Sequence, residues 1–206
     1  MGNSNNQNID QISQASQGSG QSCNFSRNTQ TYLNTFSCIL DNMIKGMTGA
    51  ELTNSISHNF IVQMIPHHKA AIEMSENILK YTTNLTIESI ACNIIEEQTK
   101  SIANMEKVLS CCSNQRNSDQ SLYEYQNTVN KISQNMFCRM RDAESVNSVN
   151  CNFLREMLPH HEGAVAICEA TLEYRTCPEL DPILDSIITS QKRGICQMEE
   201  LLGRLC

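Results

Sequence analysis

One pentapeptide occurs twice in this chain of 206 residues: Met64-Ile65-Pro66-His67-His68 returns as Met157-Leu158-Pro159-His160-His161. The two copies hold four of the five histidines and lie 93 residues apart (160 − 67). The same offset, without a gap, pairs identical residues on both sides of the motif: Met43 with Met136, Met47 with Met140, Asn59-Phe60 with Asn152-Phe153, Tyr81 with Tyr174, Gln98 with Gln191, and Met105-Glu106 with Met198-Glu199. The chain is therefore an internal duplication of one structural unit.

Each copy of the motif lies in a run of residues whose apolar side chains recur at three- and four-residue steps, the period of an amphipathic helix. The predicted helices span about 30–47, 55–79 after a cap at Asn54 or Ser55, 86–109, 120–142, 149–174 and 179–204. Gly46 and Gly49 are expected to end the first helix, and Pro182 fits the first turn of the last.

The order of these helices predicts an all-α fold. Short turns inside each half make antiparallel helical hairpins, and two hairpins that bury their apolar faces on each other give a four-helix bundle with pseudo-two-fold symmetry. The extra helix before each hairpin is expected across the ends or along the flank. We predict one domain over residues 28–206, with repeat halves at about 30–110 and 120–204. Residues 1–27, rich in Asn, Gln, Ser and Gly, are predicted to be a disordered polar tail.

The composition argues against several partners. The formal net charge of −7 disfavours a nucleic acid held through its phosphates. No segment approaches the roughly 20 apolar residues of a membrane span, and the N-terminus lacks the basic start and apolar stretch of a secretory signal. Eleven cysteines are present, and apart from Cys151, which stands opposite His58, they do not follow the repeat. We therefore expect most of them to be reduced thiols in a cytoplasmic protein.

The repeated motif brings imidazole and thioether groups to one side of a helix, with Met64 one turn before His67. Thioethers are soft ligands that suit Cu(I), and imidazole suits copper, zinc and iron, so the mixture favours copper. The candidate ligands are His67 and His160 as the primary pair, Met64 and Met157 one turn earlier, His68 and His161 as second choices, and Met74, Met105 and Met198 to complete the set. These residues favour a non-enzymatic protein that binds a copper ion, in sequestration or tolerance.

Two other interpretations stay open. Methionines at helical spacing commonly fill a core, and the histidines can be packed side chains bonded to Gln98 and Gln191 in a structural or interaction module. The third interpretation is a ferritin-like redox enzyme. A carboxylate-bridged di-iron site would use Glu three residues before His, where this chain has Met64 and Met157.

The motif and its surroundings resemble the DUF305 family, whose hallmark reads Phe, Met-Ile-Pro-His-His and Ala-Ile-x-Met, followed on the next helix by Gln-x-x-Glu-Ile-x-x-Met. The matching residues are Phe60, 64–68, 71–74 and 98–105, and then Phe153, 157–161, Ala164-Val165 and 191–198. The resemblance implies a ferritin-like four-helix bundle and a link to the handling of copper or other metals. The chain departs from the hallmark at Ser101 and Gly194, where the family has Glu, and at Ile167, which stands opposite Met74.

Overall fold

The computed structural model describes residues 25–206, which form six α-helices and no strand. The helices are α1 (Arg27–Thr48), α2 (Ile56–Ile78), α3 (Leu85–Cys112), α4 (Asp119–Arg141), α5 (Val149–Leu172) and α6 (Asp181–Leu205). All six lie where the apolar period predicts them, with ends that differ by a few residues. Most of the predicted disordered tail, residues 1–27, lies outside the described residues.

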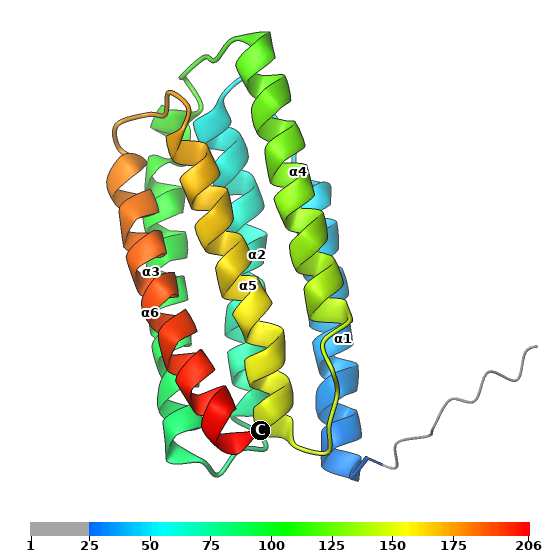
Figure 1. Ribbon diagram of the computed structural model, residues 1–206. Coiled ribbons are helices and arrows are strands. Elements are labelled where there is room, and N and C mark those ends of the chain that lie inside the picture. The colour runs from blue at the N-terminus through cyan, green and yellow to red at the C-terminus, as the bar shows by residue number, and fades with distance from the viewer. Residues whose placement is uncertain (1–24) are drawn as a thin grey trace, which may run out of the picture.

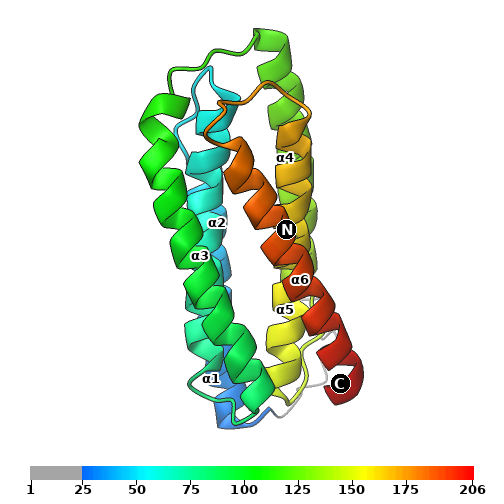
Figure 2. The same cartoon turned by 90° about the vertical axis from the view of Figure 1, so that its left-hand side faces the viewer.

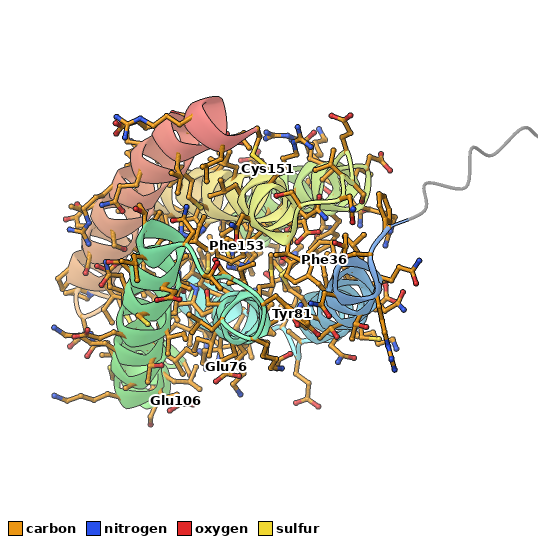
Figure 3. The ribbon with its side chains drawn as sticks, turned by 90° about the horizontal axis from the view of Figure 1, so that it is seen from below. Phe36, Glu76, Tyr81, Glu106, Cys151 and Phe153 are labelled. Atoms are coloured by element: carbon orange, nitrogen blue, oxygen red, sulfur yellow. A yellow bond between two sulfur atoms is a disulfide. The ribbon has the colours of Figure 1, made fainter. Side chains whose placement is uncertain are left out.

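The two halves of the duplication form two layers of three helices (Figure 3). Helices α1, α2 and α3 make one layer, and α4, α5 and α6 make the other. The central helices α2 and α5 pack against each other, and each also packs against the other two helices of its own layer. Phe36 and Phe153 lie between the layers, whereas Glu106 lies on the outside. The interior between the layers is therefore where the repeated apolar residues of both halves meet.

Helices α2, α3, α5 and α6 form the predicted four-helix bundle from the hairpins α2–α3 and α5–α6, and the fold is ferritin-like. The two extra helices flank this bundle and do not lie across its ends. Helix α1 packs against α2, α4 packs against α5, and the two extra helices contact each other (Figure 1). On the opposite flank, α3 and α6 lie side by side in front of α2 and α5 (Figure 2).

Residues shared by the two halves hold the start of each motif helix. Ser55 and Ser148 are the N-caps of α2 and α5, and each hydroxyl oxygen accepts the backbone N–H three residues later. The side chain of Asn59 accepts from the backbone N–H six residues earlier and donates to the C=O of that same residue. Asn152 makes the same two bonds in the second half. The repeated Asn thus ties each motif helix to the loop before it.

Gly46 does not end α1, contrary to the sequence prediction. It lies inside the helix, and a Cβ at this position would lie 2.7 Å from the Cβ of Pro66 in α2. The missing side chain therefore allows α1 to approach α2 closely, one residue before His67. Gly49 is the C-cap of α1, and Pro182 lies in the first turn of α6, both as expected.

One hydrophobic core joins all six helices and contains few aromatic residues. Every methionine among the described residues is buried. These are Met43, Met47, Met64, Met74, Met105, Met136, Met140, Met157 and Met198. Their burial suits both core filling and a role as ligands. None of the helices from Arg27 to Leu205 is long and apolar enough to cross a membrane.

Four of the ten described cysteines form two disulfides, Cys112–Cys177 and Cys151–Cys206. The expectation of reduced thiols is therefore wrong for these four. Cys168 is a buried free thiol, and the exposed free thiols are Cys38, Cys92, Cys111, Cys138 and Cys196.

The disulfide Cys151–Cys206 has a counterpart in the first half. The 93-residue offset places His58 opposite Cys151 and Ser113 opposite Cys206. His58 Nδ1 lies 2.8 Å from Ser113 Oγ. Each half thus joins the start of its motif helix to the end of the helix that follows, by a hydrogen bond in one half and a covalent bond in the other.

Candidate metal centre

The two histidine pairs lie in the middle of α2 and α5, the central helices of the two layers. Both helices continue through the proline of the motif. His67, His68 and His160 have no exposed surface, and His161 is 2% exposed. The four imidazoles therefore lie in the interior of the bundle.

The rings of His67 and His160 stack across the interface between the two layers. Their centroids are 3.7 Å apart and their planes differ by 31°. The geometry within each half is the same: the centroids of His67 and His68 are 5.9 Å apart at 53°, and so are those of His160 and His161. The four rings thus form one group, with a stacked inner pair and one further ring in each half.

Hydrogen bonds define part of the protonation pattern. His160 Nε2 lies 3.1 Å from the backbone carbonyl oxygen of His67. Because a carbonyl only accepts, His160 Nε2 carries the proton, and Nδ1 holds the lone pair of the neutral ring. That Nδ1 is buried and has no hydrogen-bond partner. His160 therefore presents one nitrogen that is free to bind a ligand.

Five imidazole nitrogens of this group are buried and make no well-formed hydrogen bond: both nitrogens of His67, and Nδ1 of His68, His160 and His161. The side-chain oxygens of Gln98 and Gln191 are also buried and unpartnered. The expected hydrogen bonds from the histidines to these two oxygens are therefore not formed. Leaving a buried polar atom unpaired costs about 1–3 kcal/mol, so a ligand that pairs these nitrogens would stabilise the fold.

Burial keeps the imidazoles neutral. Burial lowers the pKa of His160 to about 4 and, with a smaller effect of the nearby His160, lowers the pKa of His68 to about 3. The pKa values of His67 and His161 lie well below the usual range, first because of burial and then because of the neighbouring histidines. Neutral imidazole is the form that binds metals, so the group is competent to do so near neutral pH.

Within residues 25–206, no three side chains of His, Cys, Asp or Glu gather into a group that could hold a metal ion. An ion at this site would therefore need thioether sulfur beside the imidazole nitrogens. Met64 and Met157 lie one turn before His67 and His160 in the same helices, and Met74, Met105 and Met198 are buried in the same core. The structure brings the four predicted histidines together and buries the five predicted methionines in the core of the bundle.

Two residues beside the histidines have roles that the sequence analysis did not assign. Ser101 Oγ lies 3.0 Å from His68 Nε2, and a Cβ on Gly194 would lie 3.1 Å from His161 Nε2. The two residues share one repeat position (101 + 93 = 194). The sequence could have pointed to these two residues, because each of them replaces the Glu that the DUF305 hallmark has at that position.

Glu156 is a further buried group that the sequence analysis did not single out. It is 2% exposed, and burial raises its pKa to about 8. The hydroxyl of Tyr32 in α1 donates to Glu156 Oε2 at 2.6 Å. Glu156 therefore pairs with the flanking helix and lies outside the histidine group.

These features define a class of protein: a duplicated helical bundle whose two central helices each bury a His-His motif against the other. The family described as "Domain of unknown function (DUF305)" matches residues 57–202, and the chain belongs to this family. A crystal structure of a DUF305 fragment from Deinococcus radiodurans is similar, with 27% identity and a TM-score of 0.53 over 73% of this chain and 97% of that chain. CopM in an Ag-bound form, obtained by soaking, has 25% identity and a TM-score of 0.55 over 74% of this chain and 98% of that chain. No curated protein matches the chain.

Proposed function

We propose that the protein binds a soft monovalent metal ion, Cu(I) or its analogue Ag(I), and does so without catalysing a reaction. His67 and His160 are the primary nitrogen ligands in this proposal, with His68 and His161 as second choices. The sulfur ligands come from Met64, Met157, Met74, Met105 and Met198. The similarity to CopM, whose structure has been solved in an Ag-bound form, supports the proposal.

The observation that best supports the proposal is the hydrogen bonding of the His67 ring. Both of its nitrogens are buried, and neither makes a well-formed hydrogen bond, although the backbone of His160 lies close to the ring. Most buried polar side-chain atoms in proteins have a partner, so an imidazole with none needs an explanation. A bond from one of these nitrogens to a metal ion would supply it. His160, whose ring centroid is 3.7 Å away, would add a second nitrogen through its unpartnered Nδ1.

The charge of the surroundings favours a monovalent ion. The imidazoles are neutral, and burying an uncompensated charge in a protein interior is expensive. This cost rises steeply with the charge of the ion, and no cluster of carboxylates or thiolates among residues 25–206 is placed to offset it. Divalent zinc is usually held by thiolate, imidazole and carboxylate ligands, whereas thioethers select Cu(I). The site therefore suits Cu(I) better than Zn(II).

A structural role for the histidines is the second candidate function. The full burial of the rings favours it, and so does the bond from His160 Nε2 to the His67 carbonyl, which ties α5 to α2. In that case the protein is a helical interaction module and takes up no ion. The two candidates therefore predict opposite results for metal uptake.

The test is an anaerobic Cu(I) titration against a competing chelator, with Zn(II) and Fe(II) in parallel and metal analysis afterwards. Surface thiols also bind Cu(I), so they are first replaced by Ser. The replaced residues are Cys23, which lies outside the described residues, and the exposed free thiols Cys38, Cys92, Cys111, Cys138 and Cys196. This cysteine-depleted protein keeps both disulfides and the buried Cys168.

Cu(I) uptake by the cysteine-depleted protein, with weaker Zn(II) uptake, would support the proposal. A folded protein that takes up none of the three ions would support the structural role. Iron uptake accompanied by oxygen consumption would instead indicate a ferritin-like redox enzyme.

A further inference from the structure

A groove of about 690 Å³ lies between α3 and α6. Figure 2 shows these two helices in front of α2 and α5. Ser101 lines the groove from α3, and Arg193 lines it from α6. These two helices pack more extensively on α2 and α5 than on each other. The floor of the groove therefore lies toward α2 and α5, the helices that carry the histidines.

The groove lies directly over the outer histidine of the first half. Ser101 lines the groove, and its hydroxyl oxygen lies 3.0 Å from His68 Nε2. His68 itself has no exposed surface. Ser101 therefore covers the ring nitrogen that faces the groove.

The outer histidine of the second half has no such cover. Gly194 occupies the repeat position of Ser101. It does not itself line the groove, but it follows Arg193, the last groove-lining residue of α6. Gly194 is partly exposed, and a Cβ on it would lie 3.0 Å from Cδ2 and 3.1 Å from Nε2 of His161. Because Gly194 has no side chain, no group from this position of α6 covers His161 Nε2, and the ring is 2% exposed, whereas His68 has no exposed surface.

The charges along the groove are balanced. Glu97 and Asp185 offset Lys100 and Arg193, and Glu97 forms an ion pair with Arg193 between the two helices. The groove therefore neither repels nor concentrates a small cation, so the nitrogen beneath it decides where an ion binds first.

We infer that a soft cation reaches the buried histidines through the groove between α3 and α6 and meets His161 before His68. The reason is that Ser101 covers one outer ring and Gly194 leaves the other open. This inference rests on the proposed function and gives the two halves unequal parts in binding. From His161 the inner pair is close, since the ring centroids of His160 and His161 are 5.9 Å apart.

The test uses the full-length cysteine-depleted protein and silver nitrate. NMR of the 15N-labelled imidazoles follows the ring nitrogens as Ag(I) is added below one equivalent, and stopped flow with a competing indicator gives the association rate. The variants are Ser101→Gly, Gly194→Ser and the two together. Gly203→Ser is the matched control, because it places a serine in the same helix at a position with no atom within 4 Å.

In the parent protein, the His161 signals are expected to shift before those of His68. Gly194→Ser should slow association by at least about tenfold relative to Gly203→Ser, because the added side chain covers the first nitrogen that the ion meets. The variant with both substitutions should regain the association rate of the parent protein. Its His68 signals should shift before those of His161. Ser101→Gly, which adds no atoms, should make the two outer rings shift together even if Gly194→Ser fails to fold.

Simultaneous shifts of His68 and His161 in the parent, an unchanged order in Ser101→Gly, or equal rates for Gly194→Ser and Gly203→Ser would each overturn the inference. All three outcomes leave the proposed function intact, because the parent still binds Ag(I). A parent protein that binds no Ag(I) would contradict the proposed function and this inference with it.

Discussion

The imidazole rings of His67 and His160 stack at the centre of the bundle with their centroids 3.7 Å apart. They occupy the same position in the two repeats, and each comes from the central helix of its own layer. Because His160 Nε2 also donates to the His67 carbonyl, the pair is a junction between the halves as well as the candidate ligand pair. Substituting either residue therefore changes packing and chemistry together, and both have to be measured.

Lowering the pH from about 7 to about 5 should destabilise the metal-free protein. The folded pKa values of His160 and His68, about 4 and about 3, lie below the ordinary value of 6.5 because the rings are buried. The unfolded chain therefore binds protons in this range that the folded chain does not, and stability falls as the pH drops through the ordinary pKa. The loss at pH 5 is about 2 kcal/mol for each such histidine.

Urea unfolding at the two pH values measures this loss. The experiment is best done in the Glu156→Gln variant, since the titration of Glu156 acts in the opposite direction. Equal unfolding free energies at the two pH values would contradict the burial of neutral histidines.

Glu156→Gln should stabilise the protein near pH 8 and have little effect near pH 5. The folded pKa of Glu156, raised to about 8 by burial, exceeds its ordinary value of 4.5. The stability that its neutral form contributes is therefore present at low pH and is lost as the pH rises toward the folded pKa. Glutamine keeps an oxygen that can accept from the Tyr32 hydroxyl, and Gln63 already occupies the equivalent position of the first half.

The expected gain for Glu156→Gln near pH 8 is about 2–4 kcal/mol, measured by urea unfolding. Glu106→Gln, an exposed change in α3, is the matched control and should stay within about 0.5 kcal/mol of the parent. A gain of the same size at both pH values would show that the burial of the carboxyl is not its cause.

A third disulfide should form in the variant His58→Cys with Ser113→Cys, beside the two native ones. These two positions correspond to Cys151 and Cys206 in the repeat, and their present side chains are already in hydrogen-bond contact. The new bond would close a loop much like that of the native pair, which spans 55 residues, and should stabilise the oxidised protein by about 2–4 kcal/mol. Mass spectrometry and thermal unfolding with and without reductant test this, with His58→Cys alone as control. If the two introduced thiols stay free in the oxidised double variant, the two halves are not equivalent at these positions.

Gly46→Ala should destabilise the protein, although Ala favours helices over Gly. The new Cβ would lie 2.7 Å from the Cβ of Pro66, so α1 has to shift away from α2, at a cost of about 1–3 kcal/mol. Gly203→Ala, where the Cβ meets nothing within 4 Å, should instead be neutral or stabilising by up to about 1 kcal/mol. Denaturant midpoints of the two variants compare them directly. A stabilising Gly46→Ala would show that α1 does not approach Pro66 as described.

The repeat and the apolar period were sufficient to predict the six helices and the bundle, because both signals are local or internally copied. The prediction for Gly46 was wrong because its role is a contact with Pro66, 20 residues away (66 − 46), and helix-ending preferences do not include such contacts. The disulfides were missed for a similar reason. Cys112 and Cys177 are 65 residues apart, and only the packed fold brings their Cα atoms within 5.3 Å.

The sequence was sufficient to predict which residues form the candidate site, but not which of their atoms are left without a hydrogen-bond partner. The duplicated motif pointed to His67 and His160, and the fold brings them together. Which ring nitrogens stay unpaired depends on neighbours from other helices. Ser101 bonds one outer ring, and Gln191 leaves its oxygen unused. Such details follow from helix rotation and side-chain packing, which the spacing of residues along the chain does not determine.

The most direct test of the central claim is the Cu(I) affinity of the variant His67→Ala with His160→Ala in the cysteine-depleted protein, measured together with its thermal unfolding. His58→Ala is the control, because the fifth histidine lies outside the buried group and bonds Ser113. If the pair binds the ion, the affinity of the double variant falls at least ~10-fold, equivalent to ~1.4 kcal/mol, while His58→Ala keeps the parent affinity. An unchanged Cu(I) affinity together with a lower melting temperature of the double variant would contradict the claim and show that the two histidines serve the fold alone.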